Sequence, residues 1–305
     1  MSYDVSIIVP VCNEEGNIKV LFDKISLAMP RDLSWQLLIV DDGSTDRSRE
    51  EIRALCRDKK NVSAILFSKN YGHQIALSAG YDHAEGRAVI TMDADLQHPP
   101  ESLPAMLQLW RDGAEIVFAV RRDDGAASPL KRLTSRWFYA LLKAISRIDF
   151  IPGAADFRLL DRKAVDHLKL YHERDRFLRG IIGDMGFRRA IYRYDEAPRQ
   201  HGVSKYGPLQ MIRLAITGIV SFSSFPLKLC STLGFFISIA SLLYAGAIIY
   251  DKLTRGAPVG IASVLVGVFF IGGVQLIFIG VLGEYLMSVF KEVKARPLYC
   301  ISEKI

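Results

Sequence analysis

Two aspartates one residue apart, Asp93 and Asp95, follow an apolar run that is typical of a buried strand. The run, Val89 to Met92, ends there, because the pair Pro99 and Pro100 behind the aspartates cannot continue a strand. In an open α/β sheet, ligands bind outside the carboxyl ends of the strands. Carboxylates at that edge suit Mg²⁺ or Mn²⁺, and such a cation would neutralise a nucleotide diphosphate. The alternative is that both aspartates are solvated loop residues. The surrounding sequence decides between this interpretation and a cation site.

Carboxylates also follow two earlier stretches of strand-like sequence. Residues 5–10 lead to Glu14, and residues 35–40 lead to Asp41 and Asp42. Parallel strands place their carboxyl ends at the same edge of a sheet, so all these side chains are predicted to meet. A carboxylate only accepts hydrogen bonds when ionised. Such a group of carboxylates in a basic protein requires a cationic or hydrogen-bond-donating partner.

Strands and helices alternate as far as Arg121, which predicts an α/β domain with a mainly parallel sheet and right-handed crossovers. No Gly-x-Gly-x-x-Gly follows the first strand and no Walker loop occurs, which disfavours dinucleotide-binding and P-loop proteins. The predicted strands span 5–10, 35–40, 62–67, 89–92 and 115–120, and the predicted helices span 15–28, a segment ending near 58, a segment ending near 84, and 100–112.

The chain of 305 residues is 50% hydrophobic, with a mean hydropathy of +0.17, and the apolar excess lies near its end. The stretches Leu229–Tyr250 and Val259–Leu282 contain no charge, and each is about as long as the roughly 20 residues that cross a bilayer. They predict two membrane helices, with a pair of buried core helices as the alternative. The predicted organisation is an α/β domain (1–206), a juxtamembrane amphipathic helix (207–228), a two-helix membrane domain (229–290) and a tail (291–305).

The net charge of +6 and the pI near 9.1 raise the question of a nucleic-acid partner. The basic residues gather in 121–147 and 174–228, close to the membrane segments, and no RNA-binding or recognition-helix pattern is present. A bilayer surface and phosphate-bearing ligands therefore explain the charge better than nucleic acid does. Positive residues flank both spans, which predicts a multi-pass protein of the cytoplasmic membrane with its catalytic domain and both termini in the cytoplasm.

The N-terminal residues show no secretory signal, and the four cysteines have no metal-binding spacing, so free thiols are expected. Residues 130–148 have an apolar side and scattered basic residues, which favours a helix lying at the membrane interface. Gly272 and Gly273 would let membrane helices approach closely, which leaves a homo-oligomer open.

Six blocks with acidic, glycine or basic residues in fixed order are spread over the chain: Val9–Glu14, Val40–Asp46, Asp93–Glu101, Asp156–Leu160, Phe177–Gly180 and Arg199–Tyr206. Together they resemble glycosyltransferase family 2 enzymes of GT-A (Rossmann-like) fold. The two predicted membrane helices narrow the resemblance to the branch of dolichol-phosphate mannosyltransferases and polyprenyl-phosphate glucosyltransferases. The resemblance extends over nearly the whole chain.

The resemblance implies a nucleotide diphosphate sugar as donor, with UDP-glucose favoured over GDP-mannose and a UDP-aminopentose. By resemblance, Mg²⁺ or Mn²⁺ would be held against the diphosphate by Asp95 with Asp93 and Gln97. His98 beside them suits a supporting polar role better than a metal-ligand role. The residues that would contact the nucleotide are Pro10, Glu14, Asp41, Asp42 and Asp93.

The implied acceptor is a polyprenyl phosphate, whose second pKa near 6 makes it largely dianionic at neutral pH. It is then already a nucleophile, and the site needs cations more than a general base. The basic candidates for its phosphate are Arg121 first, then Arg199 and Lys205, then Arg136. The resemblance also implies catalytic roles for Asp95, Arg121 and Asp156.

Asp156 would act as a base or orient the acceptor, with a structural salt bridge to Arg158 as the alternative. Arg179 fits acceptor binding and a structural role equally well.

The sequence therefore predicts an inverting, membrane-anchored enzyme that moves one sugar onto polyprenyl phosphate at the cytoplasmic face. A processive polysaccharide synthase of the same family would need a Gln-x-x-Arg-Trp block, and Arg136-Trp137 has no such glutamine. A non-catalytic membrane scaffold with this fold would be expected to have lost the acidic strand ends, which are present.

Overall fold

The computed structural model describes residues 3–122, 151, 154–195, 223–255 and 260–305. The predicted interfacial helix at 130–148 and most of the juxtamembrane helix lie outside these residues. Three candidate acceptor-binding residues, Arg136, Arg199 and Lys205, lie outside them as well.

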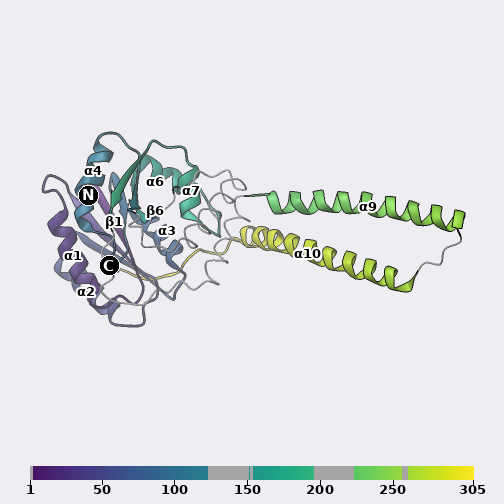
Figure 1. Ribbon diagram of the computed structural model, residues 1–305. Coiled ribbons are helices and arrows are strands. Elements are labelled where there is room, and N and C mark those ends of the chain that lie inside the picture. Colours follow the sequence, from purple (N-terminus) through teal and green to yellow (C-terminus); the bar gives the residue numbers. More distant parts are fainter. Residues whose placement is uncertain (1–2, 123–150, 152–153, 196–222, 256–259) are drawn as a thin grey trace.

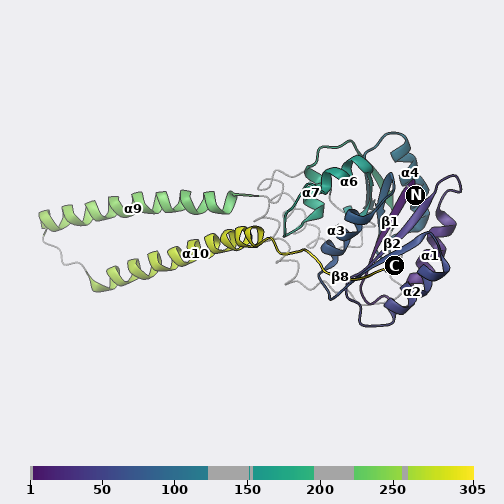
Figure 2. The same cartoon turned by 180° about the vertical axis from the view of Figure 1, so that it is seen from behind.

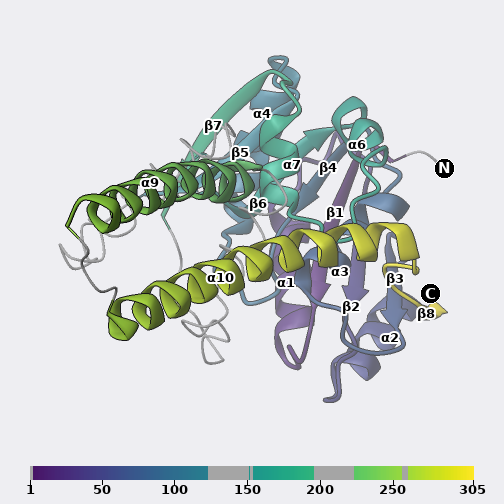
Figure 3. The same ribbon diagram turned by 90° about the vertical axis from the view of Figure 1, so that its right-hand side faces the viewer.

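The described residues form one eight-stranded sheet with the order β7-β5-β6-β4-β1-β2-β3-β8 (Figure 3). Three strands, β4, β1 and β2, are parallel neighbours, with β1 in the middle. Their carboxyl ends therefore lie next to one another, as the sequence predicted. The strands are β1 (Val5–Val11), β2 (Trp35–Asp41), β3 (Val62–Phe67), β4 (Ala88–Thr91), β5 (Ile116–Arg121), β6 (Ala154–Asp161), β7 (Arg189–Tyr194) and β8 (Ile301–Lys304).

Two strands run against the parallel direction. Strand β6 lies between β4 and β5 and is antiparallel to both, so its beginning lies at the edge where β4 and β5 end. Strand β8 pairs antiparallel with β3 at the far side of the sheet. The α/β fold with a mainly parallel core is confirmed, and the complete sheet is mixed.

Helices cover both faces of the sheet, because alternate strand side chains point to opposite sides. In β1, Val5, Ile7 and Val9 pack with helices α1, α2 and α4, whereas Ile8 packs with α3, α6 and α7. A strand buried on both faces has a nearly continuous apolar sequence, and this explains the predominantly apolar residues at 5–10. The helices are α1 (Asn17–Ala28), α2 (Ser48–Asp58), α3 (His73–His83), α4 (Leu103–Arg111), α6 (Arg162–Leu168) and α7 (Leu178–Asp184).

Two long helices, α9 (Phe225–Arg255) and α10 (Ile261–Lys294), extend as a pair away from the α/β domain (Figure 1). Both are long and apolar enough to cross a membrane, and none of the residues in their apolar windows is buried. The alternative of buried core helices is therefore wrong. The first helix begins at Phe225, four residues before the predicted span at Leu229.

The chain returns to the domain after α10, and β8 completes one side of the sheet (Figure 2). The sequence predicted only a tail for residues 291–305. None of the four cysteines, all within the described residues, is in a disulfide.

Gly86 shows how closely the elements pack at the edge of the sheet opposite the acidic strand ends. Its N–H donates to Ser6 Oγ at 2.7 Å, and a Cβ at Gly86 would lie 2.3 Å from Ser6 N and 2.6 Å from Val5 C. The turn before β4 therefore has room only for glycine.

We expect Gly86→Ala to lower the free energy of unfolding by about 1–3 kcal/mol, because the backbone of β1 has to move. Thermal unfolding of the purified protein measures this. Gly246→Ala is the control, since a Cβ there meets no atom within 4 Å. Equal unfolding midpoints for the two variants would contradict the prediction.

Candidate active site

The loops that follow β1 and β2 are joined by hydrogen bonds through Asn13. This residue adopts a left-handed conformation with φ 56°, which asparagine tolerates better than most side chains. Its N–H donates to Ser44 Oγ at 3.0 Å, and its Oδ1 accepts from Thr45 N at 2.8 Å. Next to it, the N–H of Glu14 donates to Ser48 Oγ at 2.9 Å. Glu14, predicted to bind nucleotide, is thereby held at the same edge as Asp41.

Asp41 and Asp42 are both buried, and each accepts hydrogen bonds from the protein. Asp41 Oδ2 accepts from Arg49 Nε at 2.8 Å, while Arg49 Nη2 donates to Phe67 O at 2.6 Å. Asp42 Oδ1 accepts from Tyr71 N at 2.6 Å, and its Oδ2 accepts from Gly72 N at 2.9 Å. Burial raises the pKa of Asp42 in spite of these donors. Both carboxylates therefore hold neighbouring loops in place.

Gly43 allows the β2 loop to lie directly against residues 68–72. It has φ 72°, and a Cβ there would lie 2.4 Å from Asn70 N and from Lys69 C. The turn after Asp42 thus needs glycine both for its backbone conformation and for this close approach.

Asp93, Asp95 and Gln97 alternate with buried neighbours, so all three side chains remain partly exposed at the end of β4. Asp95 Oδ1 accepts from Gln97 N at 3.2 Å. Leu96, with φ 63° and a buried side chain, provides the turn that keeps the acidic side chains at the surface. Their exposure contrasts with the burial of Asp41 and Asp42.

His98 supports the acidic segment 93–97 from inside the protein. Its side chain is almost fully buried and stacks on Phe157, with ring centroids 4.9 Å apart. His98 Nδ1 accepts the N–H of Asp93 at 3.0 Å, so it carries no proton to donate to Asp93 Oδ2 at 3.7 Å. His98 thereby fixes the backbone at Asp93.

The residues at the end of β4 fit a hard divalent cation. Carboxylate and amide oxygens are the ligands that Mg²⁺ prefers, and it is commonly held by one or two carboxylates together with substrate phosphates. Within the described part of the chain, no three acidic, histidine or cysteine side chains form a complete metal site. Asp93, Asp95 and Gln97 therefore suit a cation that a bound diphosphate also ligates.

Asp156 lies near the start of β6 and is the centre of a buried polar cluster. Its carboxylate pairs with Arg158 and with Arg179, whose Nη2 lies 2.9 Å from Oδ2. Oδ2 also lies 3.4 Å from His73 Nε2 and accepts from Gln74 Nε2 at 3.3 Å. The guanidinium groups and the histidine overcome the effect of burial and hold the pKa of Asp156 well below its usual range.

His73 joins this cluster to the acidic pair. It begins helix α3, and its Nε2 lies 3.6 Å from Asp93 Oδ1 as well as near Asp156. Burial favours the neutral ring, but the carboxylates of Asp156 and Asp93 outweigh it and raise the pKa of His73. The sequence analysis did not identify His73 or Gln74 as site residues. Their position directly after the third strand was the available signal.

The state of Asp156 bears on its predicted role. A general base works best when its pKa is close to the working pH, and Asp156 has a pKa far below neutrality. The salt bridge to Arg158 that the sequence left as the alternative is formed. Asp156 therefore acts in the structure as a fixed anion that orients Arg179, whose side chain is 43% exposed.

Arg121 is exposed at the end of β5. Because β4 and β5 are both antiparallel to β6, Arg121 lies at the same sheet edge as Asp93. The next residue, Arg122, pairs with Asp195 at 3.3 Å.

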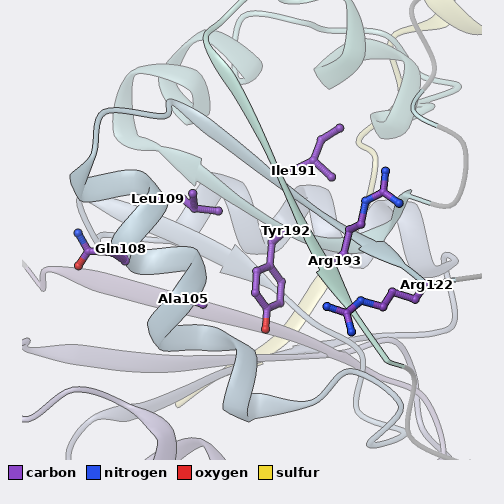
Figure 4. A pocket seen from close by; sticks show the side chains of 7 residues that line it. All are labelled: Ala105, Gln108, Leu109, Arg122, Ile191, Tyr192 and Arg193. Carbon is purple, nitrogen blue, oxygen red and sulfur yellow. The ribbon is translucent and has the colours of Figure 1, made fainter.

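A surface pocket lies between α4 and β7 (Figure 4). It contains no predicted site residue, although Arg122 brings it close to Arg121. Its lining residues are Ala105, Gln108, Leu109, Arg122, Ile191, Tyr192 and Arg193.

The model of glycosyl transferase family 2 matches residues 6–169 of this chain. An uncharacterized glycosyltransferase of Synechocystis is 40% identical over 305 residues, which cover 99% of this chain and 96% of the relative. The SfII prophage-derived bactoprenol glucosyl transferase of Shigella flexneri is 40% identical over 301 residues, covering 98% of this chain and 97% of the relative.

The crystal structure of S. aureus TarS residues 1–349 in complex with UDP-GlcNAc aligns with a TM-score of 0.50. The sequences are 16% identical, and the alignment covers 72% of this chain and 67% of that one. This likeness concerns the fold, which is that of GT-A glycosyltransferases.

We expect Asp156→Asn to destabilise the protein by about 3–5 kcal/mol at neutral pH, because Arg158 loses its buried counter-charge. Ionised Asp156 stabilises the folded state above the ordinary aspartate pKa of about 3.9, and this contribution disappears as the pH falls through its lowered folded pKa. The difference in the free energy of unfolding between wild type and variant should therefore become smaller below about pH 4. Unfolding in denaturant at several pH values measures it.

Asp166→Asn is the matched control, since Asp166 is 60% exposed and pairs with Arg162 on the surface of α6. This substitution should lower the free energy of unfolding by less than about 1 kcal/mol. An Asp156→Asn protein as stable as this control at neutral pH would refute the proposed role of the cluster.

Proposed function

The chain belongs to glycosyl transferase family 2, and we propose that it transfers one sugar from a nucleotide diphosphate donor to a polyprenyl phosphate at the cytoplasmic membrane. One observation carries the proposal: the partly exposed carboxylates of Asp93 and Asp95 share a sheet edge with Arg121, in a domain joined to two exposed apolar helices. Similarity over nearly the full length to a bactoprenol glucosyl transferase supports the choice of acceptor.

The donor would bind at the ends of β1, β2 and β4. Asp93, Asp95 and Gln97 would hold Mg²⁺ or Mn²⁺ against the diphosphate. When bound, the cation stabilises the negative charge that develops on the leaving nucleoside diphosphate. The base and ribose would meet the remaining nucleotide-site candidates, Pro10, Glu14, Asp41 and Asp42.

The acceptor would approach from the side of β5 and β6. An oxygen of the lipid phosphate attacks the anomeric carbon while the bond from that carbon to the diphosphate breaks, and one displacement inverts the configuration. The dianionic phosphate needs no general base, which agrees with the ion-paired state of Asp156. Arg121, with Arg179 from the Asp156 cluster, would offset the repulsion between the two phosphates.

The C-terminal strand supports the proposed topology. Helices α9 and α10 connect one side of the domain to β8, which pairs within the same sheet (Figure 2). If both helices span the bilayer, the chain crosses it twice and both ends stay with the domain. Lys228, Lys291 and Lys294 flank the helix ends at the domain, which favours the cytoplasmic side.

UDP-glucose is the leading donor, because several similar proteins are named glucosyl transferases. GDP-mannose and a UDP-aminopentose are the alternatives from the sequence, and a non-catalytic scaffold is the alternative of a different class.

We expect purified protein in detergent, with Mg²⁺ and undecaprenyl phosphate, to transfer radiolabel from one nucleotide sugar into the organic phase. UDP-glucose, GDP-mannose and a UDP-aminopentose are tested in parallel. Asp95→Asn should lower turnover at least about 100-fold, since it removes a charge from the cation site. Normal turnover in this variant would exclude the proposed cation site, and absence of turnover with every donor would favour the scaffold.

Arg121→Ala should raise the KM for lipid phosphate by about tenfold or more, because a charged hydrogen bond is worth about 1.5–3 kcal/mol. The KM for the donor should change less than about twofold. Arg122→Ala is the matched control, because it removes the same charge from a neighbouring residue that pairs with Asp195. A larger effect on the donor than on the acceptor would assign Arg121 to the donor site.

A further inference from the structure

The C-terminal strand β8 is attached to the strand that leads into the donor site. Ala64 and Ile305 exchange two backbone hydrogen bonds of 2.9 Å, and Ser68 N donates to Cys300 O at 3.0 Å. Ser302 Oγ donates to Leu66 O at 2.9 Å. The strand therefore follows β3 to its last residues, where the 68–72 loop begins.

An aromatic contact extends this attachment. The ring of Tyr299 stacks on the fully buried ring of Phe67, with centroids 5.0 Å apart and planes at 19°. Phe67 in turn meets Tyr71 edge to face at 5.6 Å. The hydroxyl of Tyr299 donates to Asp82 Oδ2 on α3 at 3.1 Å. Tyr299 thus fixes the side chain of Phe67, which directly precedes the 68–72 loop. Through Phe67 it also positions the ring of Tyr71 inside the loop.

The other face of this loop holds the buried carboxylates. The N–H groups of Tyr71 and Gly72 bind Asp42, and Phe67 O accepts from the guanidinium that also binds Asp41. Since the backbone of the loop also packs closely against Gly43, a shift of the loop must move Asp42.

A second attachment of β8 is to helix α2, one helical turn after Arg49. Arg53 Nη2 pairs with Glu303 Oε2 at 2.7 Å, whereas Arg49, on the same helix, binds Asp41. Residues three or four apart face the same side of a helix, so β8 contacts the side of α2 that reaches the donor site.

We propose that β8 is a positioning element of the donor site, with Tyr299 as the residue that sets the 68–72 loop and thereby Asp42 for the nucleotide. This inference rests on the proposed function, because it assumes that Asp41 and Asp42 contact the nucleotide. The membrane helix α10 leads directly into the segment that shapes the donor site.

The test measures binding of UDP with Mn²⁺ to the full chain in detergent by calorimetry, with GDP in parallel. Tyr299→Ala should raise the Kd of the nucleotide that wild type binds by about tenfold, which is the upper range for loss of an aromatic pair. Tyr299→Phe keeps the stacked ring, so its Kd for the nucleotide should stay within about twofold of the wild-type value. This conservative variant therefore serves as the rescue.

Lys304→Ala is the control on the same strand, because its Nζ contacts His83 at the far end of α3. In steady-state assays, Tyr299→Ala should raise the donor KM and leave the acceptor KM within about twofold. If Tyr299→Ala does not fold, Tyr299→Leu keeps apolar bulk without a stacking ring and carries the same expectation.

Nucleotide affinity in Tyr299→Ala or Tyr299→Leu equal to that of wild type would overturn the inference. An equal loss in Lys304→Ala, or an equal rise in both KM values, would overturn it too, since either result would indicate a general structural effect. Failure of wild type itself to bind UDP or GDP would instead overturn the proposed function and remove the premise.

Discussion

A buried carboxylate is stable as an anion only when donors replace the water it has lost, and this constraint shapes the whole catalytic edge. Asp41 has Arg49, Asp42 has the N–H groups of the 68–72 loop, and Asp156 has two guanidinium groups. Each set of donors comes from a different element. Satisfying the buried charges therefore fixes the loops relative to one another.

The same constraint separates the acidic residues by function. Asp93 and Asp95 are only partly buried, so their side chains reach the surface at the end of β4, where the proposed cation would bind. Asp156 has its charge balanced within the protein, so it holds Arg179 and His73 in place at this edge of the sheet.

The sequence revealed the α/β order and the acidic strand ends, since both depend on local patterns: apolar runs, turn residues and charges directly after a strand. It could not show that Asp42 binds a loop backbone while Asp93 stays exposed, because burial depends on neighbours distant in the chain. His73 and Arg179 meet Asp156 from separate helices, so no local spacing predicts the cluster. Strand β8 has four residues of alternating burial after a long apolar helix, and only pairing with β3 defines it.

The junction between the domain and the two apolar helices depends on similar attachments. Lys291 on α10 pairs with Asp175 at 2.7 Å, and Arg174 N donates to Glu292 Oε1 at 2.6 Å. A partly exposed ion pair alone contributes at most about 1 kcal/mol, so this contact cannot hold a domain against a helix by itself. Strand β8 adds backbone hydrogen bonds a few residues later. Residues 174–175 also lead into α7, which carries Arg179, so the end of α10 is attached close to α7 as well as to β3.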